Sequence, residues 1–152
     1  IGHKIGQWPI RLLATPNHEL VTRVAALADT DLRGTPLPTP KPPAWHGELD
    51  PESARFFWSR PTLEPSLVDG NETVINTAFT KCKLNAPNPI TADTVDQFFK
   101  QHPRHKGEFS LVLALLIDQN LSSVVLPTHI DTMFAWLYDG TEPGSAPIDD
   151  IT

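Results

Sequence analysis

The chain has 152 residues, of which 39% are hydrophobic and 20% are charged, and its formal net charge is −6. This length suits one globular domain, and the longest apolar run, Leu111 to Ile117, is too short to cross a membrane. We therefore expect a soluble protein, with an intracellular location favoured, and the 16 prolines indicate long loops between its elements.

The N-terminal segment 1–14 shows no clean helical period, because two glycines and a proline interrupt it. It is predicted to be an extended arm. Thr15 and Pro16 then form a helix start, with Thr as the N-cap and Pro at the first helical position. Apolar side chains recur on one face after this start, which predicts a first helix over Pro16–Ala28.

A proline-rich strap over residues 33–49 follows, and its five prolines predict extended, polyproline-like chain. Asp50 and Pro51 repeat the helix-start signal, so a second helix is predicted over Pro51–Ser59. The strap is not expected to dock on a proline-binding domain, because basic residues are absent beside its single Pro-x-x-Pro spacing.

The second predicted helix carries three consecutive aromatic residues, Phe56, Phe57 and Trp58. Successive residues on a helix point about 100° apart, so the three rings cannot share one side. Either the strap folds back over them, with Trp45 against the rings, or a protein partner covers them. These four residues are the candidate binding residues of this region.

Four more helices are predicted from apolar periodicity and caps, although a strand is the competing interpretation of Thr73–Phe79 and of 110–117. The segment 108–119 is apolar nearly all round, so it is expected to be fully surrounded by the core. The four predicted helices begin after Asn71, after Thr91, at Glu108 and after the cap Thr128, and they end near Asn85, Gln101, Gln119 and Gly140.

These elements predict an all-α fold, an irregular bundle of about six helices with the strap between the first and second helices. Residues 1–140 are expected to form a single helical domain, followed by a flexible acidic tail over 141–152.

Cys82 is a weak candidate for a catalytic nucleophile, since the ammonium groups of Lys81 and Lys83 would favour its thiolate. The competing interpretation is a small buried side chain, because Cys82 shares the apolar stripe of its helix. It is the only cysteine, so no intrachain disulfide can form. The six histidines show no spacing typical of metal ligands, and we expect no metal site and no cofactor.

Arg104, His105 and Lys106 form the densest basic cluster and are a weak candidate anion site. A nucleic-acid adaptor acting through Lys100–Lys106 is one functional hypothesis. However, from Gly107 onward the chain has seven acidic residues and no basic one, so it should repel phosphates, and nucleic acid is not the expected partner.

The preferred functional hypothesis is a non-catalytic helical protein–protein interaction or assembly module, of the kind found in capsid-like or scaffold domains cut from a larger polypeptide. A protein partner or self-assembly is therefore expected. The alternative is a small enzyme that uses Cys82 with a histidine, and the nucleic-acid adaptor is the third hypothesis.

Overall fold

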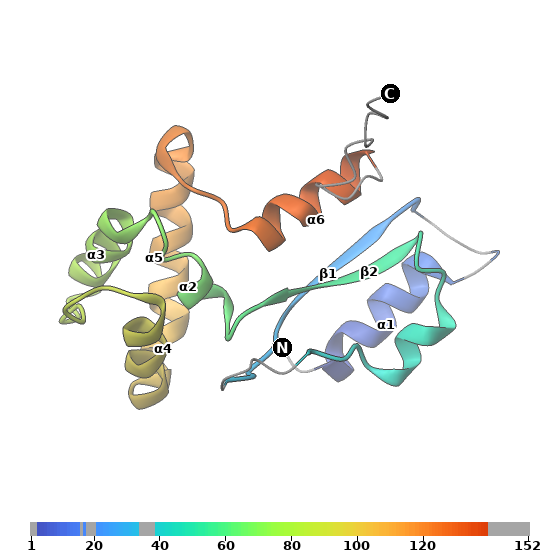
Figure 1. The fold of residues 1–152 in the computed structure, drawn as a ribbon, viewed down its shortest axis with the longest axis horizontal. Helices are drawn as coiled ribbons and strands as arrows, with labels where there is room; N and C mark the ends of the chain where they lie inside the picture. The colour runs from blue at the N-terminus through green and yellow to red at the C-terminus, as the bar shows by residue number, and fades with distance from the viewer. Residues whose placement is uncertain (1–2, 16, 18–20, 34–38, 140–152) are drawn as a thin grey trace, which may run out of the picture. The chain divides into compact units, whose positions relative to one another are not determined.

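The computed structural model describes residues 3–15, 17, 21–33 and 39–139 (Figure 1). In this part the chain is mainly helical, with six α-helices and one sheet of two parallel strands. The elements in chain order are α1 (His3–Ala14), β1 (Val24–Asp29), the 3-10 helix η1 (Ala44–Glu48), β2 (Ala54–Ser59), α2 (Leu63–Ser66), α3 (Glu72–Lys81), α4 (Ala92–Gln101), η2 (Pro103–His105), α5 (Lys106–Gln119), η3 (Leu121–Ser123) and α6 (Thr128–Asp139).

The all-α prediction is wrong, because the chain has an α/β fold. The predicted helix over Pro16–Ala28 is instead strand β1 where its C-terminal half is described. The N–H of Val24 donates to the carbonyl of Ser53 at 2.8 Å, and the N–H of Thr30 donates to that of Ser59 at 3.0 Å. The apolar spacing of so short a segment fits both the helical period and the strand period. Pairing with β2 therefore decides the structure in favour of a strand.

The helix predicted over Pro51–Ser59 is also wrong, because β2 occupies most of it. The helix-start signal at Asp50 produces only a turn: the carbonyl of Asp50 accepts from the N–H groups of Ser53 and Ala54, both at 2.9 Å. A strand places successive side chains on opposite faces, so the aromatic triplet is divided between the two faces of the sheet.

The extended arm predicted over 1–14 is a third error, since residues 3–14 form α1 even with Pro9 inside it. One face of α1 buries Ile10 and Ala14. Burial of this face stabilises a helix whose glycine and proline content disfavours it locally. The strap of 33–49 ends in η1, and its residues 34–38, like the predicted tail of 141–152, lie outside the described residues.

The chain divides into two compact units. The first contains the described residues within 1–28, 39–58 and 128–152, and the second contains those within 29–38 and 59–127. In the first unit, α1 lies against one face of the strands and α6 lies on the opposite face (Figure 1). Its buried cluster is formed by Ile10, Ala14, Leu49 and Ala54, with Val24, Ala26, Trp45 and Phe56 packed against it. The expectation of a single domain stays a prediction.

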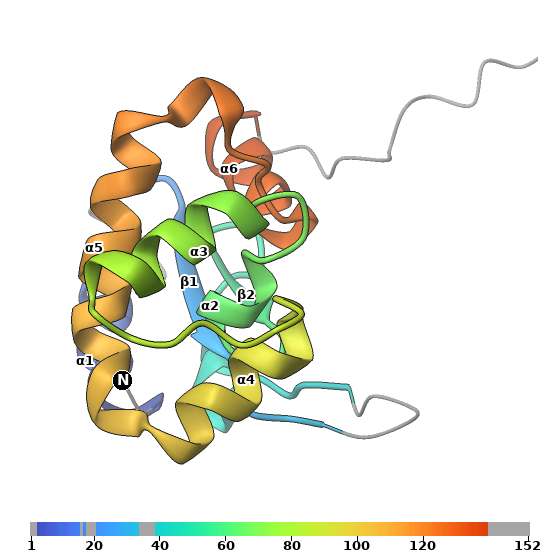
Figure 2. The ribbon, with the colours of Figure 1, turned by 90° about the vertical axis from the view of Figure 1, so that its left-hand side faces the viewer.

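The second unit is helical, and Figure 2 shows α2, α3 and α4 packed on one side of α5. Its centre is aromatic: the ring of Phe79 lies 4.7 Å from that of Phe109 and 5.9 Å from that of Phe99. The predicted helices that correspond to α3, α4, α5 and α6 are confirmed, while α2 has no counterpart among the predictions. The expectation that α5 is fully surrounded is wrong, because Leu111 and Leu115 are exposed on it.

Candidate functional site

An aromatic cluster joins the end of the strap to one face of the sheet. The ring of Trp45 in η1 meets the ring of Phe56 edge-on at a centroid distance of 5.8 Å, and Phe56 stacks on Trp58 at 5.4 Å. The ring of His46 lies 5.1 Å from that of Phe56, and its Nε2 is 3.0 Å from the carbonyl oxygen of Ala54. The end of the strap thus covers part of the aromatic triplet.

Phe57 points to the opposite face of the sheet, where its ring lies 5.8 Å from that of Trp136 in α6. The guanidinium of Arg55 lies 5.2 Å from the same indole ring, within the range of a cation–π interaction. Trp136 is fully buried, and its Nε1 finds no hydrogen-bond acceptor in the described part of the chain. All four candidate binding residues therefore have packing contacts within the first unit, and their binding of a partner stays a prediction.

Cys82 follows the last residue of α3, and its side chain is only 9% exposed. Burial raises the pKa of the thiol, and the nearby charge of Glu108 raises it further. Lys81 and Lys83 are exposed. A thiol with a raised pKa stays protonated at neutral pH, whereas a nucleophile needs the thiolate. This environment favours a packing role for Cys82.

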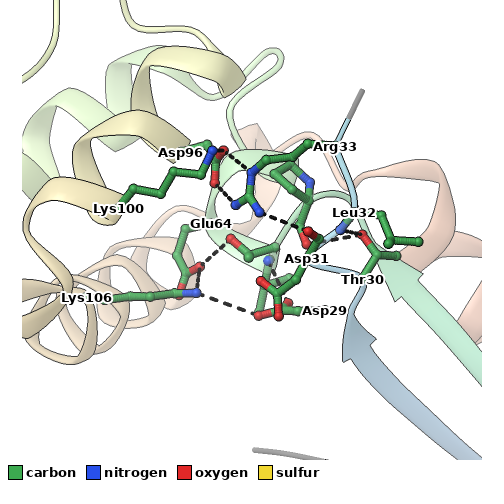
Figure 3. Close-up of polar contacts among 12 residues, drawn as sticks. Asp29, Thr30, Asp31, Leu32, Arg33, Glu64, Asp96, Lys100 and Lys106 are labelled. Carbon is green, nitrogen blue, oxygen red and sulfur yellow. Dashed lines mark hydrogen bonds and ion pairs between the residues drawn. The ribbon is translucent and has the colours of Figure 1, made fainter. Parts of the chain in front are cut away.

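Lys106 belongs to a polar network in which Glu64 is buried and Lys106 and Asp29 are half-buried (Figure 3). Its Nζ lies 3.0 Å from Oε2 of Glu64 and 3.6 Å from Oδ2 of Asp29. Glu64 is buried and also accepts a hydrogen bond of 2.7 Å from the hydroxyl of Ser110. Burial disfavours the charge of Lys106, but the hydrogen bond and the charge of Glu64 outweigh this effect and raise its pKa. The charge of Lys106 is therefore compensated inside the second unit.

A second ion pair fixes the chain after β1 to α4. Arg33 donates to both carboxylate oxygens of Asp96, with a distance of 2.7 Å from its Nε to Oδ2 (Figure 3). The Nζ of Lys100 lies 3.0 Å from the same Oδ2. The hydrogen bond from Arg33 lowers the pKa of Asp96. Both Lys100 and Lys106 are thus engaged by carboxylates, which leaves Arg104 and His105 as the accessible part of the predicted basic cluster.

Arg104 and His105 line a cavity of about 300 Å³ beside the end of α3. The Nε of Arg104 donates to Nε2 of His105 at 3.3 Å. The lining contains four residues that carry or can carry a positive charge and no acidic residue; it consists of Lys83, Leu84, Asn85, Phe98, His102, Arg104 and His105. Lys83 escaped prediction, because it comes from a separate turn and no sequence spacing signals its approach to Arg104. His102 lies two residues before Arg104 in the same turn but was not among the candidate site residues.

Three helices carry a pair of large exposed apolar side chains four residues apart, which places each pair on one face. Trp8 on α1 is 71% exposed and Leu111 on α5 is 64% exposed. The pairs are Trp8 with Leu12 on α1, Leu111 with Leu115 on α5, and Phe134 with Tyr138 on α6. The α5 pair could have been predicted from the sequence. The segment is apolar around its whole circumference, so a helix that buries one face exposes apolar side chains on the other.

No three His, Cys, Asp or Glu side chains converge on a possible metal position anywhere in the described ranges. Within the same ranges, none of the helices is long and apolar enough to span a bilayer. No known protein family, curated protein or solved structure matches the chain.

Proposed function

We propose that the chain is a non-catalytic protein–protein interaction module that assembles with copies of itself through the outer faces of its helices. The observation that carries this proposal is the set of exposed apolar pairs on α1, α5 and α6. Exposed apolar side chains that cluster on one face mark interaction sites, and tryptophan is among the residues that contribute most to binding energy. Trp8 is therefore the strongest candidate anchor.

The charges around two of the pairs are complementary. The described side chains of α1 include one basic residue, Arg11, and no acidic one. Arg11 also pairs with the exposed Glu48. On α5, Glu108 lies three residues before the leucine pair and Asp118 lies three residues after it, so both acids share its stripe. Opposite charges at the rim steer partners together, which favours contact between α1 of one copy and α5 of the next.

Such a contact uses two different surfaces and is heterologous. Each copy that joins through its α1 still presents its α5 pair, so the association can continue beyond a dimer unless the geometry closes a ring. This property suits a scaffold or capsid-like role, which we include in the proposal.

Sedimentation velocity over a range of protein concentrations tests this function. We expect a wild-type mass above the 16.8 kDa of one chain that rises with concentration. Trp8→Ser combined with Leu12→Ser, and Leu111→Ser combined with Leu115→Ser, should each reduce the association strongly, since each removes one half of the contact.

Phe134→Ser combined with Tyr138→Ser is the matched control, because it removes a similar exposed pair from a helix outside the contact. It should leave the association largely intact. A wild-type chain that stays monomeric at every concentration, or assembly that both test variants leave unchanged, would overturn the proposal.

A further inference from the structure

We propose that the basic cavity beside the end of α3 binds a phosphate monoester of a small molecule. A phosphate monoester carries up to two negative charges at neutral pH and offers three acceptor oxygens. Lys83 and Arg104 supply two permanent positive charges to the lining, and His102 and His105 supply further nitrogen donors. The absence of an acidic residue from this lining makes the cavity selective for anions.

Lys83 is held in place by the turn that ends α3. Its backbone adopts the left-handed conformation with φ of 56°, and its N–H donates to the carbonyl of Thr80 at 3.0 Å. The N–H of Leu84 reaches back to the carbonyl of Phe79 at 2.9 Å. These bonds close the helix end in a Schellman-like turn, so the backbone that carries the ammonium group is fixed before a ligand arrives.

The opposite wall comes from the turn between α4 and α5. The N–H of His105 donates to the carbonyl of His102 at 3.1 Å, which closes this turn. The Nε of Arg104 is occupied by the ring of His105, so its two terminal amino groups remain to face a ligand. A guanidinium presents these groups as a planar fork that matches two oxygens of a phosphate.

The two cations that line the cavity differ from their neighbours in the second unit. Lys100 and Lys106 are engaged by carboxylates of Asp96, Asp29 and Glu64. By contrast, no carboxylate of the described residues lies within 4.0 Å of the charged groups of Lys83 or Arg104. An anionic ligand would therefore meet two charges that no carboxylate among the described residues compensates.

The remaining wall is suited to the organic part of the ligand. Phe98 and Leu84 contribute apolar surface, and the ring of His102 packs against that of Phe98 at a centroid distance of 4.7 Å. A volume of about 300 Å³ lies at the lower end of small-molecule sites. This size suits a phosphate with a sugar or one ring system and excludes a folded macromolecule from the interior.

Calorimetric titration of the full chain with adenosine 5′-monophosphate, ribose 5-phosphate, inorganic phosphate and adenosine tests this inference. We expect both monoesters to bind, inorganic phosphate to bind more weakly because it lacks the organic part, and adenosine not to bind. Arg104→Gln and Lys83→Asn should each weaken monoester binding about 10-fold to 100-fold, because each removes a charge-assisted hydrogen bond. Asn is chosen because it tolerates the left-handed conformation.

Lys81→Gln is the matched control, since Lys81 lies two residues from Lys83 but does not line the cavity, and it should leave the affinity within about twofold. Glu108→Gln should tighten binding, because it removes a negative charge that acts on this helix end. The inference is overturned if neither monoester binds at about 1 mM. It is equally overturned if adenosine binds as well as its monophosphate, or if the Lys83 and Arg104 variants, shown to be folded by their melting temperatures, bind like wild type.

Discussion

Asn71 shows how a single side chain fixes two distant segments of the second unit. Its Nδ2 donates to the carbonyls of Leu67 and Val125 at 2.9 and 2.7 Å, and its Oδ1 accepts from the N–H of Val125 at 2.9 Å. The side chain is buried, so these three bonds satisfy an amide that would otherwise be costly to bury. The start of α3 and the segment before α6 therefore depend on one residue.

We predict that Asn71→Ala lowers the free energy of unfolding by about 2–4 kcal/mol, because it leaves the backbone groups of Val125 without partners. Asn76→Ala, on the exposed face of α3, should change it by less than about 0.5 kcal/mol. Urea denaturation of both variants measures the difference, and equal effects would refute this role of Asn71.

Asp96 provides a pH-dependent contribution to stability. Its pKa is lowered in the folded state, mainly by the hydrogen bond from Arg33, so its contribution is present above the pKa of the unfolded chain, near 3.9. The contribution is lost as the pH falls through the folded pKa. Asp96→Asn should therefore lower the free energy of unfolding by about 1–3 kcal/mol at pH 7. It should also make this free energy fall less steeply as the pH is lowered, which flattens the acid limb of its pH dependence.

Asp93→Asn is the control for this experiment, because Asp93 is an exposed acid in the first turn of the same helix. Its effect should stay below about 1 kcal/mol, the usual size of a helix-dipole interaction. Thermal denaturation between pH 2 and pH 7 separates the two variants. An acid limb as steep in Asp96→Asn as in wild type would contradict the assignment.

Among the predicted helix starts, the one at Thr91 was correct, whereas those at Thr15 and Asp50 were wrong. Thr91 is the N-cap of α4 as expected, and the structure adds a reciprocal partner: the N–H of Thr94 donates to Oγ1 of Thr91 at 3.2 Å, and the N–H of Thr91 donates to Oγ1 of Thr94 at 2.9 Å. A cap acts within four residues, so its signal is local. The partners of Lys106 could not be predicted, because Asp29 and Glu64 reach it only through the fold.

At the scale of elements, α5 has one buried face and one exposed apolar face. Leu113 is 3% exposed and Leu115, two residues later, is 55% exposed. Leu113→Ala should lower the free energy of unfolding by about 2–5 kcal/mol, whereas Leu115→Ala should change it by less than about 0.5 kcal/mol. Chemical denaturation at a concentration too low for association measures both values. A large loss for Leu115→Ala would show that this leucine belongs to the core.

Four of the helices, α3 to α6, were predictable, whereas α1, α2 and the two strands were not. The segments of α3, α4, α5 and α6 are each at least ten residues long, so their apolar residues repeat over enough turns to show the helical period. The strands β1 and β2 have six residues each, and six residues fit either period. Each strand is stabilised by its pairing with the other strand, although the strap separates the two in sequence.

At the scale of the whole molecule, the pairing of β1 with β2 is what the sequence-based prediction missed. Without it the predicted fold class was all-α, whereas the observed class is α/β. The pairing also explains the aromatic triplet: a strand sends Phe56 and Trp58 to one face and Phe57 to the other, so both faces receive cover. The strap supplies part of this cover through Trp45, as one of the two sequence hypotheses expected. Large exposed apolar side chains lie instead on α1, α5 and α6, and others lie on β1 and in the segment 121–126.

Head-to-tail assembly is tested most directly by mixing two variants that each lack one half of the contact. The Trp8→Ser/Leu12→Ser chain retains only the α5 surface, and the Leu111→Ser/Leu115→Ser chain retains only the α1 surface. Each should sediment as a monomer of about 16.8 kDa, and an equimolar mixture should form a dimer of twice that mass that grows no further. A mixture that stays monomeric at concentrations where the wild type assembles would contradict the account.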